Sequence, residues 1–267
     1  MCAGRSAAVT NIVKKQRLRI TGLRIATIER IEGFGNYRGP SAYFTLERDL
    51  KRIESVFWGK ESYTYDKQQF EAFCRTIFHN RFYEMYDPPV TFLPSMKQCE
   101  RFLSVALGHV SPSDASPHRL EHSKVQTDLF ASIQGRSVFK TAEGNFGLAP
   151  KAAMVGDAVV ILLGCESAMI FREGRNDTYQ VIGEAYLDGF MECQALLGPL
   201  PDPFEYIRHY NEPNDKWYVV CFNRKTGLVQ VEDTRLGPLP EHVRTIPVLR
   251  ISPFSLEIKL TAADIVA

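Results

Sequence analysis

A chain of 267 residues with 45% apolar and 24% charged residues is long enough to bury a sizeable core and has the composition of a globular protein. Its 32 basic and 31 acidic residues leave a net charge of +1, so the charge balance gives no argument for binding nucleic acid or a membrane surface. No stretch approaches the roughly 20 apolar residues of a membrane span, and residues 1–20 contain no apolar core of a secretory signal.

The six cysteines show no CxxC spacing and lie mostly among apolar residues. This pattern predicts buried free thiols in a reducing compartment. We therefore expect a cytoplasmic protein, and the sequence leaves its oligomeric state open.

The first half of the chain predicts one strand followed by helices. Residues 17–31 alternate apolar and polar side chains, which indicates a half-buried strand or a short hairpin. A Ser- and Pro-rich stretch at 108–118 predicts an exposed loop. Apolar residues at helical spacing predict amphipathic helices on either side of this loop, at 41–58, 66–86, 96–107 and about 120–133.

From Gly135 onward the pattern changes to short β-rich runs separated by glycines. Strands at roughly ten-residue spacing are typical of a small twisted sheet or a partly closed barrel. The run "VVILL" at 159–163 is apolar without alternation, which predicts a strand covered on both faces. After the prolines at 199–203, residues 216–233 predict a hairpin whose turn is "NRKTG".

Together these patterns predict an α+β protein. Its helical N-terminal half should pack on a mainly antiparallel small β-sheet or partly open barrel, with the N-terminal strand and a C-terminal β-hairpin completing the sheet. We divide the chain into an N-terminal strand and helical region at 1–134, a β-rich core at 135–198 and a hairpin extension at 199–267, all packed as one domain.

Three motifs with possible chemistry lack the rest of their pattern. The glycines within 33–39 are spaced one residue too far apart for a GxGxxG dinucleotide loop. His118 and His122 have helical i, i+4 spacing but no third metal ligand at a convincing distance, and Cys165 follows a strand without the glycines of a nucleophile elbow. We therefore expect no metal ion and no cofactor.

The strongest candidate site is the stretch "YQVIGEAYLDGFMECQALLGPLPD" at 179–202. Strand alternation places Glu184, Tyr186 and Asp188 on one face together with Ile182. Carboxylates of like sign that lie close raise each other's pKa, which suits general acid or base catalysis by these three residues, with Glu184 as the proton acceptor or donor. The alternative is that the carboxylates face water or hold the following turn through backbone amides. The opposite face of the strand should carry Val181, Gly183, Ala185 and Leu187.

Three stretches resemble the region C-terminal to the HET module in fungal heterokaryon incompatibility proteins. They are residues 135–150, 155–173 and 179–196. The last of them is similar to the family signature Gly-Glu-x-Tyr-x-x-Gly-x-Met, and weaker likeness extends over most of 17–197. The residues that match the signature are Gly183, Glu184, Tyr186, Gly189 and Met191.

The chain also departs from this family pattern. It begins directly with the downstream region, so the resemblance implies a protein without the TIR-like effector module. Asp188 stands where the family usually has histidine, and Glu192 and Cys193 replace an Asp-Gly pair. The resemblance implies a stand-alone domain that binds a protein partner or a small ligand in allorecognition or a related response.

An enzyme is the alternative function. A cofactor-independent isomerase, cyclase or hydrolase of fungal secondary metabolism would need a pocket for an apolar metabolite, which some of the 17 phenylalanines, 11 tyrosines and two tryptophans would line. The two hypotheses differ in whether Glu184, Tyr186 and Asp188 face a cavity or water.

The tail at 217–240 resembles the later part of a WW module. Val231 and Thr234 stand where that module has its second tryptophan and a proline. Without this aromatic residue a groove for proline-rich ligands is missing, so we interpret the segment as a structural hairpin.

Overall fold

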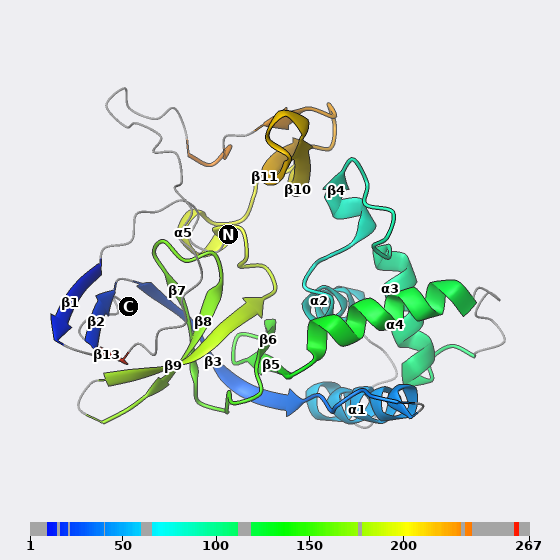
Figure 1. Cartoon of the computed structure of the whole chain (residues 1–267), viewed down its shortest axis with the longest axis horizontal. Coiled ribbons are helices and arrows are strands. Elements are labelled where there is room, and N and C mark those ends of the chain that lie inside the picture. The colour runs from blue at the N-terminus through cyan, green and yellow to red at the C-terminus, as the bar shows by residue number, and fades with distance from the viewer. Residues whose placement is uncertain are drawn as a thin grey trace.

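The chain folds into a β-barrel, a layer of helices and a second, smaller sheet, as the computed structural model shows (Figure 1). In Figure 1 the helices lie to the right of the barrel, and β10 and β11 of the second sheet lie above it. The structure describes residues 10–14, 17–20, 22–39, 41–59, 66–111, 119–175, 178–230, 233–236 and 259–261.

Six antiparallel strands form the barrel, and they close it completely. β3 pairs with both β5 and β7, and β9 pairs with both β6 and β8, so none of the six has an open edge. The α+β prediction is confirmed, and the barrel is closed because the N-terminal strand β3 inserts between β5 and β7. In order around the barrel the strands are β9 (Thr178–Leu187), β6 (Phe146–Pro150), β5 (Arg136–Thr141), β3 (Gly22–Gly33), β7 (Ala158–Leu162) and β8 (Ala168–Glu173).

The barrel interior is filled by one large ring and many small side chains. Phe139 of β5 is fully buried there among residues such as Ala149 and Ala185. Gly147 lies opposite Phe139, and a Cβ at this glycine would come within 2.1 Å of the ring. Only glycine therefore fits at this position. Strand β7 is buried along its whole length, which confirms that the apolar run is covered on both faces.

Four helices cover the outer face of β5, β6 and β9. Their apolar stripes form one core with Val138, Phe146, Leu148 and Tyr186 of these strands. Asp66 and Ser95 cap the second and third helices through hydrogen bonds to Gln68 and Gln98. The predicted helices are present as α1 (Ala42–Trp58), α2 (Lys67–Ile77), α3 (Met96–Leu107) and α4 (Arg119–Ile133).

The second sheet joins the C-terminal part of the chain to the helical part. Its order is β12 (Val229–Gln230), β11 (Lys216–Asn223), β10 (Phe204–Asn211) and β4 (Tyr86–Asp87). The predicted turn between β11 and β12 is present, but the hairpin lies in this separate sheet and does not complete the barrel sheet. Strand β10 was not predicted, and β4 occupies the end of the segment expected to be helical.

An aromatic cluster holds β4 against β10 and β11 within the second sheet. The Trp217 ring lies 5.1 Å from the rings of both Tyr86 and Tyr210, and the Arg208 guanidinium lies 5.3 Å from the Tyr86 ring centroid. The three segments that we distinguished in the sequence therefore share sheets. β3 of the first segment completes the barrel of the second, and β4 of the first segment pairs with β10 of the third.

Three further strands continue the sheet beyond β9, and short helical turns occupy three loops. The strands are β13 (Lys259–Thr261), β2 (Arg17–Ile20) and β1 (Thr10–Lys14), and the turns are η1 (Tyr83–Met85), α5 (Gln194–Leu197) and η2 (Glu212–Asn214). His118, Val231 and most of the predicted loop at 108–118 lie outside the described residues. Within the described ranges, no helix combines the length and apolarity needed to cross a bilayer.

Candidate functional site

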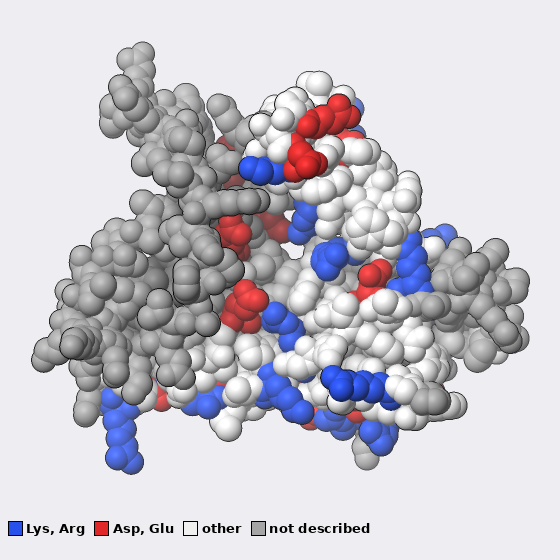
Figure 2. All heavy atoms as spheres, viewed as in Figure 1, with Lys and Arg blue, Asp and Glu red and all other residues white. Residues whose placement is uncertain are grey.

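A cleft of about 370 Å³ lies where the barrel, the helical layer and the second sheet meet. Figure 2 shows a hollow near the centre of the molecule with acidic and basic side chains at its edge. The volume lies within the range of roughly 300–1,000 Å³ typical of small-molecule sites. The lining comes from residues 79–81 after α2, Met85, Arg136 of β5, 166–167 before β8, 184–186 of β9, 191–192, 206–208 of β10 and Val219 of β11.

A left-handed turn at the end of α2 supplies one wall of the cleft. His79 and Asn80 have φ angles of 53° and 50°, which are uncommon for residues other than glycine but are tolerated best by residues such as Asn and His. Their amides donate to the carbonyls of Thr76 and Arg75, which ends the helix at Ile77. This turn explains why the helix stops before the end of the predicted segment at 66–86, and it brings the His79 ring centroid to 5.7 Å from that of Tyr186.

His79 is uncharged at neutral pH. Burial lowers the pKa of its imidazole, and the nearby charges of Arg136 and Arg81 lower it further, to about 4. An imidazole with this pKa is a weak base at pH 7, so the cleft holds a neutral ring near two arginines.

Acidification should destabilise the protein through His79. Because its pKa falls from 6.5 to about 4 on folding, the unfolded chain binds this proton more readily. The stabilising contribution is therefore complete above pH 6.5 and is lost as the pH falls toward 4, by on the order of 2–3 kcal/mol. Urea unfolding at a series of pH values should show this loss in the wild type and a flatter profile for His79→Asn, which tolerates the same backbone and does not titrate.

His209→Asn is the matched control. His209 lies on β10 and pairs with Asp87 at 2.8 Å, but the two side chains are 40% and 49% exposed, so the pair contributes little to stability. This variant should retain the wild-type pH dependence. Parallel profiles for the wild type and His79→Asn would show that His79 does not carry the effect.

Tyr186 and Asp188 contact each other, but as part of a hydrogen-bonded link between the end of β9 and α2. The Tyr186 hydroxyl donates to Asp188 at 3.1 Å, and Arg75 of α2 donates to the same carboxylate from Nε at 3.0 Å and from Nη2 at 2.9 Å. Burial, the Asp188 charge and the charge of Glu192 raise the pKa of Tyr186 well above its usual value. The phenol therefore stays protonated and is committed to Asp188.

Glu184 lines the cleft and takes no part in this hydrogen-bonded link. Its side chain is 63% exposed, and one carboxylate oxygen is 3.4 Å from Nη2 of Arg136. Of the three predicted catalytic residues, Glu184 and Tyr186 line the cleft, whereas Asp188 is not among the lining residues. The structure therefore brings Tyr186 and Asp188 into contact and leaves Glu184 with a different partner.

The predicted face of β9 is correct only after a bulge. The pairing of β8 with β9 shifts between Ile170 and Phe171, next to Gly183, whose φ is 146°. Ile182 consequently packs in the barrel interior, not on the face of Glu184 and Tyr186, and Val181 packs on the opposite side of the sheet against the cluster of Phe171.

The arginines and the histidine of the cleft were not predicted from the sequence. His79 and Arg81 were assigned to the interior of a helix, Arg136 to an ordinary strand start, and Arg208 to a segment without predicted structure. The alternation of Tyr206, Arg208 and Tyr210 is the signal that would have identified β10.

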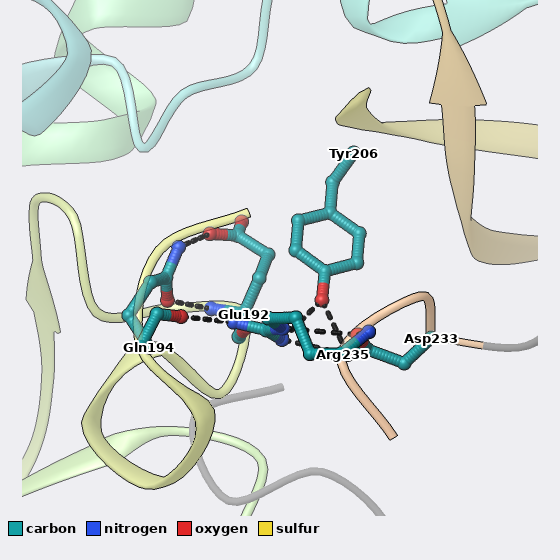
Figure 3. A network of polar contacts seen from close by, with 6 residues as sticks. Glu192, Gln194, Tyr206, Asp233 and Arg235 are labelled. Carbon is teal, nitrogen blue, oxygen red and sulfur yellow. Dashed lines mark hydrogen bonds and ion pairs between the residues drawn. The ribbon is translucent and has the colours of Figure 1, made fainter. Parts of the chain in front are cut away.

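Arg235 fixes the second sheet to the end of the barrel (Figure 3). Its guanidinium donates to the carbonyls of Gly198 and Glu192, the hydroxyl of Tyr206 and the carboxylate of Asp233. Glu192 and Tyr206 both line the cleft, so this buried network sets the relative position of two of its walls. Cys165, which the sequence raised as a possible nucleophile, is a half-buried thiol whose pKa is raised by burial.

Comparison with known proteins identifies the barrel. Residues 116–198 match the model of the Het-6 beta-barrel domain, which links the chain to heterokaryon incompatibility-type proteins. The match spans α4 and the barrel strands from β5 to β9, and it leaves out β3 and the second sheet. No curated protein and no solved structure matches the chain.

Proposed function

We propose that this chain is a non-catalytic binding protein of the heterokaryon incompatibility type, whose cleft receives a small ligand or a segment of a protein partner. The Het-6 barrel match supports the family, and the cleft at the junction of three structural layers supports the binding role. The same proposal includes the biological setting. The protein is fungal and cytoplasmic, corresponds to the region downstream of a HET module, and acts in allorecognition or a related response.

The bonding of Tyr186 and Asp188, two of the three candidate acid–base residues, is the observation that carries the non-catalytic proposal. The Tyr186 hydroxyl donates to the Asp188 carboxylate, which also accepts hydrogen bonds from Arg75. A general acid or base must instead point at the proton that it transfers and have a pKa near the working pH. The pKa of His79, about 4, is too low for that role. The cleft therefore resembles a recognition site more than a site for proton transfer.

Blocking the cleft should abolish binding. Val219 lines the cleft and is 37% exposed, so Val219→Trp places a large ring in it without burying a polar group. A fragment mixture screened by ligand-observed NMR should give hits with the wild type that are lost with Val219→Trp. Val229→Trp is the matched control, since Val229 lies in the same sheet, is 36% exposed and is not a cleft residue.

Two outcomes would contradict the proposal. Hits that survive Val219→Trp, or that both variants remove equally, would place binding outside the cleft. Chemical conversion of a bound fragment that stops in Glu184→Gln would show that the protein is an enzyme, because this substitution preserves the shape of the side chain and removes its titrating proton.

A further inference from the structure

The cleft carries both signs of charge in equal number. Three of its lining residues are arginines and three are glutamates, and the one lining histidine is neutral at pH 7. A ligand with a single charge would be attracted by one set and repelled by the other. The charged residues are Arg81, Arg136 and Arg208, and Glu166, Glu184 and Glu192.

Two of the three basic groups lie near His79, and the third, Arg208, lies over the Tyr86 ring. Arg136 and Arg81 both lie close enough to depress protonation of its ring. Arg136 is only 24% exposed, and its contacts with the carboxylate and the carbonyl of Glu184, at 3.4 Å and 3.3 Å, are long for charge-assisted hydrogen bonds. These weak contacts leave the Arg136 guanidinium able to bind a carboxylate more strongly.

Two of the three acidic groups come from turns at the end of the barrel, whereas Glu184 lies on β9. Glu166 precedes β8, and Glu192 follows β9. The Glu192 carboxylate accepts a hydrogen bond from Gln194 at 3.0 Å, and the Glu192 carbonyl accepts one from Arg235 (Figure 3). Glu192 is thus held in place while its carboxylate keeps acceptor capacity for a cation.

Apolar side chains complete the lining. Met85, Met191, Ile207 and Val219 all contact the cleft, and methionine adapts readily to ligands of different shape. An entirely apolar ligand would nevertheless cover six charged groups without replacing their water, which costs free energy. The cleft therefore does not favour the apolar metabolite that the aromatic content of the sequence suggested.

We propose that the ligand of this cleft is a short zwitterionic peptide with apolar side chains. Its carboxylate binds Arg81 and Arg136, its ammonium group binds Glu166 and Glu192, and its side chains pack on the methionines and Val219. This inference rests on the proposed binding function and specifies its ligand class.

Four leucine dipeptides test the two charges separately. Leu-Leu carries both charges, acetyl-Leu-Leu only the anion, Leu-Leu-amide only the cation, and acetyl-Leu-Leu-amide neither. Calorimetric titration of the full chain should give the lowest Kd for Leu-Leu, about tenfold weaker binding when either charge is removed, and the weakest binding for the neutral compound.

Substitutions in the two charged groups assign the ends of the peptide. Arg136→Gln should abolish the preference for a free carboxylate and keep the preference for a free amine, and Glu192→Gln should do the reverse. Arg224→Gln, on an exposed arginine outside the cleft, should change neither.

Equal binding of all four compounds, tightest binding of the neutral one, or binding of none would overturn the peptide inference. The proposed function is judged separately by the fragment comparison between Val219→Trp and Val229→Trp. Fragment hits that are lost only with Val219→Trp would preserve the binding role even where the dipeptides fail.

Discussion

Replacement of Arg235 by methionine is expected to lower the free energy of unfolding by about 3–5 kcal/mol, as is typical when one partner of a buried ion pair is removed. The Arg235 side chain is 6% exposed, and its partner Asp233 is 16% exposed. Methionine keeps much of the apolar stem but donates no hydrogen bond. The variant would leave the Asp233 carboxylate and two backbone carbonyls without their main donor.

Arg224→Met is the control for this loss. Arg224 pairs with Asp202, but their side chains are 54% and 69% exposed, so the same substitution should cost less than about 1 kcal/mol. Urea unfolding of both variants measures the difference. Similar losses for the two would show that the buried network does not stabilise the fold beyond an ordinary surface pair.

The Arg235 network also connects stability to the cleft. Its guanidinium holds Tyr206 of β10 and the backbone of Glu192 at once, and it helps to lower the pKa of Asp233 to about 2. Two walls of the cleft are therefore fixed by one side chain. A cleft held open in this way avoids part of the ordering cost of binding.

Local patterns in the sequence predicted most of the regular structure. The helices around Leu46, Phe73 and Phe102 were found because an amphipathic stripe and a cap are properties of neighbouring residues. The barrel strands from Arg136 onward were found for the same reason. The N-terminal strand was expected in this sheet, but its position between β5 and β7 and the closure of the barrel were not predicted. These pairings span more than a hundred residues, and single-sequence patterns do not encode them.

The site was only partly predictable. Glu184 and Tyr186 share a face because strand alternation holds after the bulge at Gly183, but nothing in the local sequence reports the bulge itself. The pairing of Asp188 with Arg75 is even harder to predict, since Arg75 precedes it by 113 positions and comes from another layer of the fold. Such tertiary contacts decide whether a carboxylate has a catalytic or a structural role. The residue type alone does not decide this.

Asp188→Ala should therefore act as a structural substitution, with a loss of about 3 kcal/mol in the free energy of unfolding. The Asp188 side chain is 13% exposed and receives donors from both Arg75 and Tyr186. Its removal leaves a guanidinium and a buried phenol without an acceptor. Arg75→Met should cost a similar amount, and a double-mutant cycle of the two should give a coupling energy of about 1–3 kcal/mol.

The pair of Arg136 and Glu184 provides the matched comparison, because it joins an arginine to a carboxylate of β9, four positions before Asp188. Glu184 is 63% exposed and the pair is 3.4 Å apart, so the cycle of Arg136→Met with Glu184→Ala should give a coupling energy below about 0.5 kcal/mol. A large coupling for this pair and a negligible one for Arg75 and Asp188 would reverse the roles derived from the structure. The expected order instead assigns Asp188 to holding β9 on α2 and leaves Glu184 available to a ligand in the cleft.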